Sequence, residues 1–178
     1  MPSETHPHVV SLTDVPAIES SKGTLFASRR KQLGAAANGR ALGCSHLELP
    51  PGKAAWPLHW HAANEEAVFV LEGEGTLRIG EAKVPLRAGD YVAFPAGPGA
   101  AHQIINAGTA PLRYLCFSTM VSPEVAVYPE SNKVGVMVGS APGGSKKERT
   151  LEGVFLRADG VDYWEGEDVD GDRGSAPR

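Results

Sequence analysis

The feature that most limits the fold of this chain is a series of short apolar or alternating runs, separated by turn residues and spaced about ten residues apart. The runs are rich in Val, Ile, Leu, Phe and Tyr, and the chain holds 21 glycines and 14 prolines to end them. This pattern favours many short strands over long helices. It predicts an all-β sandwich or barrel with strands at 42–49, 67–71, 76–79, 82–87, 91–94, 102–106 and 112–119, and further strands are expected at 24–28, 133–139 and 153–157.

One domain with tails is the expected organisation, because 178 residues suffice for one sizeable core and are few for two. Residues 1–22 are expected to form an N-terminal tail, and residues 23–164 a barrel with flanking strands around a central part at 41–119. Residues 165–178 belong to an acidic stretch and are expected to form a disordered C-terminal tail.

The charge pattern argues against a nucleic-acid partner. The formal net charge is −4, but acidic side chains gather in a stretch where Arg173 alone opposes them: Asp159, Asp162, Glu165, Glu167, Asp168, Asp170 and Asp172. The rest of the chain is therefore nearly neutral. No apolar run approaches the length of a membrane span and no basic, apolar leader begins the chain, so a cytoplasmic protein without a membrane partner is expected.

Three histidines and a glutamate are the candidate functional residues. His59 and His61 are two positions apart, Glu65 and Glu66 follow, and His102 comes later. On a β-strand His59 and His61 point to the same face, whereas on a helix they diverge. Neutral imidazole and carboxylate together suit divalent transition metals, so a strand here predicts a metal site. The two cysteines, Cys44 and Cys116, lie in apolar runs without a C-x-x-C pair, which argues against a zinc ribbon or a redox motif.

Two ordered motifs resemble those of the cupin superfamily and cover roughly residues 41–119. The first is Gly52, His59-x-His61, Glu66 and Gly73, and the second is Gly89, Pro95-x-Gly97, His102 and Asn106. The resemblance implies a double-stranded β-helix (jelly-roll) barrel, here with N- and C-terminal extensions. It also implies one metal ion held by His59, His61, Glu66 and His102. The distance to Gly73 favours Glu66 over Glu65 as the ligand.

The spacing departs from the family pattern in two places. Six residues separate Gly52 from His59, where the family usually has five, and four separate Gly97 from His102, where it usually has two. The second insertion lengthens the loop at 98–101 that delivers His102, and His102 is still expected to reach the metal. Strand alternation then places Glu66, Val68 and Val70 inside, and with Ile104 they predict a dry, fairly small pocket. Gln103, Asn106 and Tyr114 are candidates for orienting the imidazoles, or for unrelated hydrogen bonds.

The expected cofactor is one divalent transition metal ion per chain, Mn, Fe, Ni or Zn, which the donors do not distinguish. The chain is similar to bacterial cupins described as possible sugar-phosphate isomerases, which implies a metalloenzyme for a small polar metabolite. The alternatives are an iron-dependent dioxygenase and a non-catalytic cupin that binds or senses a small ligand. No catalytic residue is assigned. Cupins often pair through edge strands, so a homodimer is expected.

An isomerase for phosphorylated substrates would also need a cation to bind the phosphate. A basic cluster at Arg29, Arg30 and Lys31 is interpreted as a solvated strand end, with phosphate binding as the alternative. Other candidate cations are scattered along the chain and form no phosphate-binding motif: Lys53, Arg78, Lys83, Arg87 and Arg113.

Overall fold

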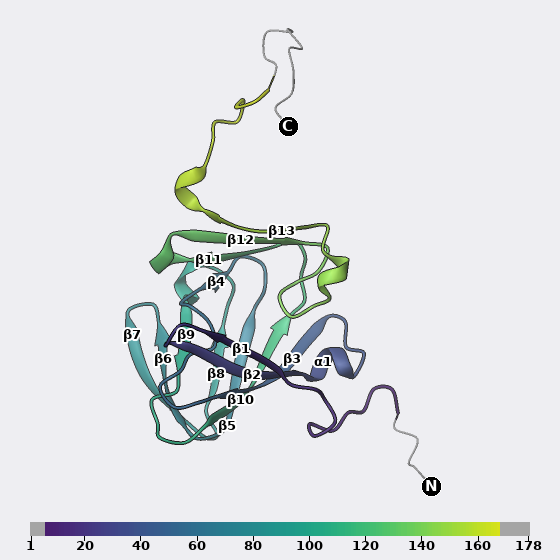
Figure 1. Ribbon diagram of the computed structural model, residues 1–178, viewed down its shortest axis with the longest axis vertical. Helices are drawn as coiled ribbons and strands as arrows, with labels where there is room; N and C mark the ends of the chain where they lie inside the picture. The colour runs from purple at the N-terminus through teal and green to yellow at the C-terminus, as the bar shows by residue number, and fades with distance from the viewer. Residues whose placement is uncertain (1–5, 168–178) are drawn as a thin grey trace.

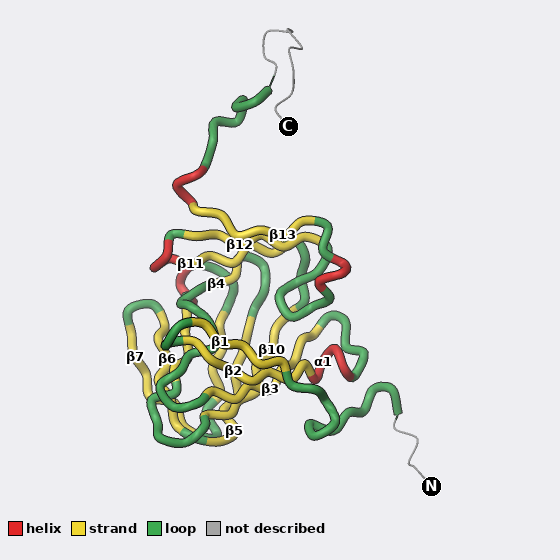
Figure 2. Tube along the Cα trace, viewed as in Figure 1, coloured by secondary structure: helices red, strands yellow, loops and turns green. Residues whose placement is uncertain are grey.

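The computed structural model describes residues 6–167, and these form a barrel of antiparallel strands with additional strands above one end (Figure 1). Strands dominate the described chain, and helical turns are short (Figure 2). The strands are β1 (Ile18–Lys22), β2 (Phe26–Gln32), β3 (Leu42–Leu49), β4 (Trp60–His61), β5 (Glu66–Glu72), β6 (Glu74–Ile79), β7 (Ala82–Arg87), β8 (Tyr91–Phe94), β9 (His102–Ile105), β10 (Leu112–Thr119), β11 (Glu124–Tyr128), β12 (Lys133–Val138) and β13 (Leu151–Leu156). The helical turns are α1 (Leu33–Ala36), η1 (Pro98–Ala100), η2 (Pro129–Ser131), η3 (Lys146–Glu148) and η4 (Arg157–Asp159). The predicted all-β fold is confirmed.

The first wall of the barrel is a six-stranded sheet in the order β1-β2-β3-β10-β5-β8. Its centre is β10, where Tyr114 lies between Leu47 of β3 and Val70 of β5. Because side chains alternate across a strand, the residues two positions away share the same inner face. Cys116, Ser45 and Val68 therefore form the next row toward the open end of the barrel.

The second wall consists of two smaller sheets, β7-β6-β9 and β13-β12-β11-β4. An isolated bridge between His59 and His102 joins them, and the two residues exchange both backbone hydrogen bonds, at 3.1 and 2.8 Å. Directly after this bridge, Trp60 and His61 pair with Val127 and Ala126 of β11. The segment that carries the predicted histidines therefore links the barrel to its C-terminal strands.

Apolar side chains fill the space between the walls. Leu47, Leu49 and Leu112 are completely buried, and Val70 and Tyr114 nearly so. Each such side chain contributes about 1.5–3 kcal/mol by leaving water. The turn between β5 and β6 depends on Gly73, whose φ of +87° disfavours any other residue, and an added Cβ there would lie 2.6 Å from the carbonyl oxygen of Pro111. Burial and this turn hold the closed end of the barrel.

Two strands lie where the sequence predicted none. β1 falls within residues 1–22, the expected tail, and pairs with β2 after a turn at Gly23. All its residues are exposed, so it has no apolar alternation to reveal it. β11 is short, is flanked by prolines and begins at the acidic Glu124. The predicted disordered tail at 165–178 lies outside the described residues from position 168 onward.

The segment between β12 and β13 descends from the C-terminal strands toward α1 (Figure 1), and its residues 139–145 line the cavity described below. It is fastened to the first wall by Gln32, whose side-chain amide donates a 2.6 Å hydrogen bond to the carbonyl oxygen of Gly143. After β13 the chain leaves the body of the molecule (Figure 1). The C-terminal extension therefore forms one side of the cavity described below.

Candidate metal centre

Three of the four predicted ligands bring their donor atoms together inside the barrel. His59 and His61 come from the segment at β4, and Glu66 comes from the first position of β5. One donor atom of each lies within 4.8 Å of the others, and both histidines are buried. The strand period places both imidazoles on the inner face. This group can hold a metal ion.

The fourth predicted ligand, His102, is adjacent to this group but does not belong to it as tightly. Its Nε2 lies 3.3 Å from Oε2 of Glu66, while its ring stacks on Phe94 with centroids 3.8 Å apart. The loop at 98–101 forms η1 and delivers His102 opposite His59, as the backbone bridge requires. The lengthened loop thus still places the imidazole beside the carboxylate.

Backbone carbonyl groups fix the orientation of two imidazoles. Nδ1 of His59 is 2.9 Å from the carbonyl oxygen of Pro57, and Nδ1 of His102 is 2.9 Å from that of Ala100. Each carbonyl can only accept, so Nδ1 carries the hydrogen and Nε2 is left with a free lone pair. This is the arrangement by which proteins prepare histidine as a metal ligand.

His61 is held differently, between two carboxylates. Its Nε2 lies 3.4 Å from Oε2 of Glu66, and its Nδ1 lies 3.6 Å from Oε2 of Glu124. Neither contact is a well-formed hydrogen bond, and both ring nitrogens are buried without a hydrogen-bond partner among the described residues. Buried polar groups are normally satisfied. A cation bound at Nε2, with the Nδ1 hydrogen directed at Glu124, would satisfy both, so the residues present fit a metal ion.

The charges of the metal-free site point the same way. Burial lowers the pKa of His61, but the carboxylates of Glu124 and Glu66 outweigh it and raise this pKa to about 9. Burial, with the neighbouring imidazoles, lowers the pKa of His59 to about 4. Burial opposes ionisation of Glu66, but His102 and His61 hold its pKa well below its usual range. In the metal-free site Glu66 is therefore ionised, His59 is neutral and His61 is protonated. A bound metal ion would replace the proton on His61.

Glu124 is the residue of this centre that the sequence analysis missed. Its carboxylate is completely buried and accepts backbone hydrogen bonds from Ala62, Ala63, Asn64 and Val125, besides one from the Asn64 side chain. It stands 58 positions after Glu66 in the sequence, beyond both cupin motifs. No local spacing connects it with His61. Only its place at the start of the short strand β11 does.

The residues expected to orient the imidazoles make their contacts elsewhere. The Asn106 side chain donates to the carbonyl oxygens of Leu49 and Ala110 and shapes a turn. Gln103 binds Arg78 and the carbonyl oxygen of Trp56. Tyr114 lies in the apolar core. Pro57, Ala100 and Glu124 take the orienting role instead.

The metal centre lies between two spaces of different character. Behind it is a void of about 20 Å³, large enough for a single water, with Val68, Phe94 and Ile104 in its walls. In front of it, toward the C-terminal extension, is an open cavity of about 950 Å³. His59, His61 and Glu66 reach this cavity. The prediction of a dry, fairly small pocket describes only the rear void.

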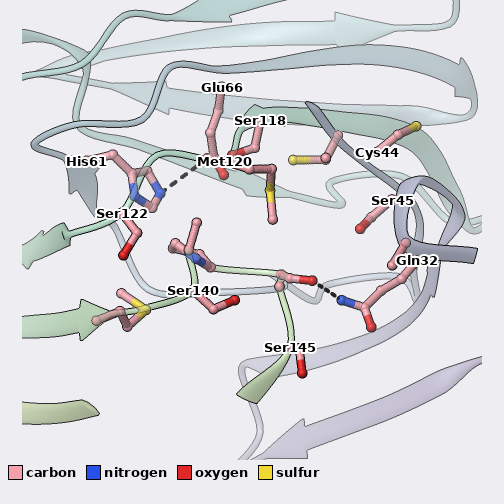
Figure 3. Close-up of a pocket in the computed structure, with 18 of the residues that line it drawn as sticks. Gln32, Cys44, Ser45, His61, Glu66, Ser118, Met120, Ser122, Ser140 and Ser145 are labelled. Atoms are coloured by element: carbon pink, nitrogen blue, oxygen red, sulfur yellow. Dashed lines mark hydrogen bonds and ion pairs between the residues drawn. The ribbon is translucent and has the colours of Figure 1, made fainter. Parts of the chain in front are cut away.

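The open cavity has many polar groups. Figure 3 shows His61 and Glu66 on one side and Gln32 on the other, with Ser118, Ser122 and Ser140 around the space between them. Tyr128 of β11 also lines it, with its ring 6.0 Å from that of His59. Parity along β5 did predict Val68 and Val70 inside, but the cavity is formed against β11, β12 and the segment after β12. Its polar character therefore comes from residues outside the predicted motifs.

The family comparison agrees with this architecture. The family model for the Cupin domain matches residues 45–118, which span β3 to β10. These residues are a cupin domain. The predicted resemblance and the cupin fold are thereby confirmed. The matched segment ends before β11, so Glu124 and the front of the cavity belong to the extension rather than to the cupin domain itself.

Solved structures extend the likeness over most of the chain. A candidate sugar phosphate isomerase from Acidithiobacillus ferrooxidans is 27% identical with a TM-score of 0.72, covering 87% of this chain and 96% of that one. A sugar phosphate isomerase from a cupin superfamily, from Silicibacter pomeroyi, has a TM-score of 0.72 at 23% identity, covering 85% and 94%, which establishes likeness of fold. At these coverages both comparisons extend beyond residue 118 into the C-terminal extension.

Among curated proteins, an oxalate-binding protein from Thermotoga maritima is 37% identical over 71 residues, 40% of this chain. The chain spans about half the length of the curated relatives it matches, 47% and 56%. Within residues 6–167, helices are too short and too polar to cross a membrane.

Proposed function

We propose that this chain is a metal-dependent cupin enzyme that acts on a small polar metabolite, in the manner of a sugar-phosphate isomerase. The observation that carries the proposal is the position of the metal centre. His59, His61 and Glu66 open onto a large cavity with both polar and apolar side chains in its wall, rather than being sealed inside the barrel. A purely structural metal site would be closed. His102 is the proposed fourth ligand, and four protein ligands leave positions free on an octahedral ion.

A bound divalent ion supplies polarisation of a carbonyl oxygen, which acidifies the neighbouring carbon. The chain must then move a proton between two carbons of the substrate. Two groups in the cavity wall are able to do so or to assist. Glu148 offers a carboxylate, and Tyr128 offers a phenol whose pKa burial raises, so it stays protonated and donates a hydrogen bond.

The size of the cavity and the hydroxyl groups in its wall support an isomerase over a dioxygenase. Cavities of 300–1,000 Å³ are typical for small ligands, and this one is at the upper end of that range. Serine hydroxyls around it match the hydroxyl groups of a polyol. The likeness to an oxalate-binding protein keeps a non-catalytic binding role as the second candidate.

Turnover separates these functions. The metal-free protein is loaded with Mn, Ni, Zn or Fe(II) and incubated with a panel of aldose and ketose phosphates, and isomer formation is followed by NMR. The proposal expects isomerisation with at least one metal, and its loss in Glu148→Gln or Tyr128→Phe with metal content unchanged. Oxygen consumption with iron alone, or tight binding without conversion, would replace the isomerase by one of the other functions.

A homodimer is part of the proposal, with β13 as its contact strand. β13 is an edge strand, and its Val154, Phe155 and Leu156 side chains are about half exposed or more. Exposed apolar edge strands are natural pairing sites. Light scattering on the wild type and on Phe155→Glu tests this. The proposal expects a dimer that the substitution weakens, and a monomeric wild type would contradict it.

A further inference from the structure

We propose that Arg30, assisted by Arg149, forms an anion-binding subsite at the far side of the open cavity, for the phosphate or carboxylate end of the ligand. This inference deepens the proposed function. It rests on that function only in assuming that the other end of the same ligand binds the metal. The two arginines come from different parts of the fold. Arg30 lies on β2 in the first wall, and Arg149 lies between η3 and β13 in the extension.

The direction of Arg30 follows from the strand register. Arg30 pairs with Leu47, which is completely buried inside the barrel, and Gln32 pairs with Ser45 on the same face. Its neighbours on β2 lie on the opposite face. Arg29 is exposed and lies 3.7 Å from Glu19, and Lys31 donates to the carbonyl oxygen of Leu12. The basic cluster of the sequence is therefore divided, and only Arg30 lines the cavity.

The Arg30 side chain has no counterion among the described residues. It is half-buried, and its guanidinium makes no hydrogen bond or ion pair with any residue in the range 6–167. Burial lowers the pKa of its guanidinium, which expresses the cost of withdrawing this charge from water. Unpaired charges in such positions are expensive for a protein. A ligand anion would remove that cost.

Arg149 is a further cation of the same cavity, besides Arg30 and Arg40. Its side chain is 7% exposed, and it binds Glu152 and, at 3.2 Å, the carbonyl oxygen of Ala141. Its Nε is buried without a hydrogen-bond partner among the described residues. The bond between Gln32 and Gly143 joins the two segments that carry Arg30 and Arg149. Both cations therefore flank the point where the extension meets the barrel.

The separation from the metal centre indicates the kind of ligand. β2 and β5 are separated by β3 and β10, so three strand spacings of about 4.8 Å, or roughly 14 Å, lie between the backbones of Arg30 and the metal-binding strand. Glu66 and Arg30 both extend into that gap, so the ligand spans only part of it. Cys116 and Ser118 on β10 lie between them. A short polyhydroxy chain with an anionic end meets these conditions.

The cations considered from the sequence are unsuited to this role. Arg78 binds Glu130, Arg113 binds Glu48 and Glu72, and Lys53 donates to the carbonyl oxygen of Thr24. None of these three lines the open cavity, and neither do Lys83 and Arg87 of β7. Arginine also suits the task chemically, because its planar guanidinium binds two oxygens of a phosphate or carboxylate at once.

Calorimetric titration of the metal-free protein with inorganic phosphate, oxalate, ribose 5-phosphate and uncharged ribose tests the subsite. Arg30→Gln is expected to weaken binding of the preferred anion at least tenfold, and Arg30→Lys is expected to restore part of the loss. Arg29→Gln is the matched control, because that neighbour faces away from the cavity. Preference for phosphate or for oxalate assigns the anionic group.

Two readouts separate a ligand-binding role from a structural one. Removing an unpaired half-buried charge should not destabilise the fold, so Arg30→Met is expected to keep or raise Tm. A lower Tm in this variant would instead indicate a structural residue and overturn the inference. Anion binding equal in Arg30→Gln and wild type, or no anion binding by the wild type, would also overturn it. If the wild type binds phosphate through Arg30 but takes up no metal, the proposed function fails and the subsite stands.

Discussion

Replacing Glu124 with glutamine is expected to destabilise this protein strongly, although the two side chains have the same shape. Glu124 is completely buried, and its Oε1 accepts hydrogen bonds from the backbone of Ala62, Ala63 and Val125 at 3.0, 3.2 and 2.8 Å. Its Oε2 accepts from the backbone of Asn64 at 2.9 Å and from the Asn64 side chain. The loop that follows His61 is built around this carboxylate.

The magnitude follows from the bonds that an amide cannot accept. The glutamine oxygen can keep the three bonds of Oε1, but the amide nitrogen then faces the two Asn64 donors. Two hydrogen bonds to a charged acceptor are lost, at about 1.5–3 kcal/mol each, so the free energy of unfolding should fall by about 3–6 kcal/mol. Metal affinity should fall about 10- to 100-fold, because the carboxylate facing Nδ1 of His61 is replaced by an amide.

Urea unfolding of the metal-free protein, followed by circular dichroism, measures the first quantity, and competition with a metal indicator measures the second. Glu65→Gln is the matched control. Glu65 is exposed on the neighbouring loop position, and its substitution should change stability by less than about 0.5 kcal/mol. If Glu124→Gln unfolds at the same urea concentration as this control, the role given to Glu124 is wrong.

Three further predictions concern the site and the barrel. The pKa of His61 is raised to about 9 in the metal-free site, so a metal ion must displace a proton from His61 at neutral pH. The apparent affinity of the protein for the metal should therefore rise about tenfold per pH unit from pH 7 to about 9 and then level off, and a flat profile in indicator titrations would contradict this. Leu47→Ala, at a completely buried position of β3, should lower the free energy of unfolding by about 2–5 kcal/mol, whereas Leu42→Ala, 60% exposed on the same strand, should change it little in the same urea assay. Gly73→Ala should lower the free energy of unfolding by more than about 2 kcal/mol, because alanine would have to adopt a positive φ and its Cβ would meet the carbonyl oxygen of Pro111. A thermal midpoint equal to that of the wild type would argue against this backbone constraint.

Local sequence patterns were sufficient for the strands of the barrel. The runs predicted at 42–49, 82–87, 91–94 and 112–119 coincide with β3, β7, β8 and β10. In each, apolar residues alternate or continue up to a glycine, proline or polar turn, so the chain encodes the ends of the strand locally. β1 is exposed throughout and polar after its first residue, Ile18, and nothing in its own sequence separates it from a tail.

The functional residues likewise include some that local sequence patterns reveal and others that only strand pairing brings to the site. His59 and His61 lie two positions apart, so strand alternation brings both to one face, and Glu66 follows five positions later at the start of the next strand. Glu124 and Arg30 contribute to the same cavity from strands far away in sequence, and only pairing registers place them there. Nothing in the sequence singled out Glu124, and nothing distinguished Arg30 from its basic neighbours Arg29 and Lys31. The cavity was underestimated for the same reason, since its front belongs to the extension beyond β10.

The most direct test of the whole account is the metal content of protein purified without chelator, measured by inductively coupled plasma mass spectrometry together with protein concentration. The account predicts about one transition-metal ion per chain in the wild type and none above background in the folded double variant His59→Ala/His61→Ala. A wild type that neither retains nor takes up such an ion, or a double variant that keeps full occupancy, would contradict it.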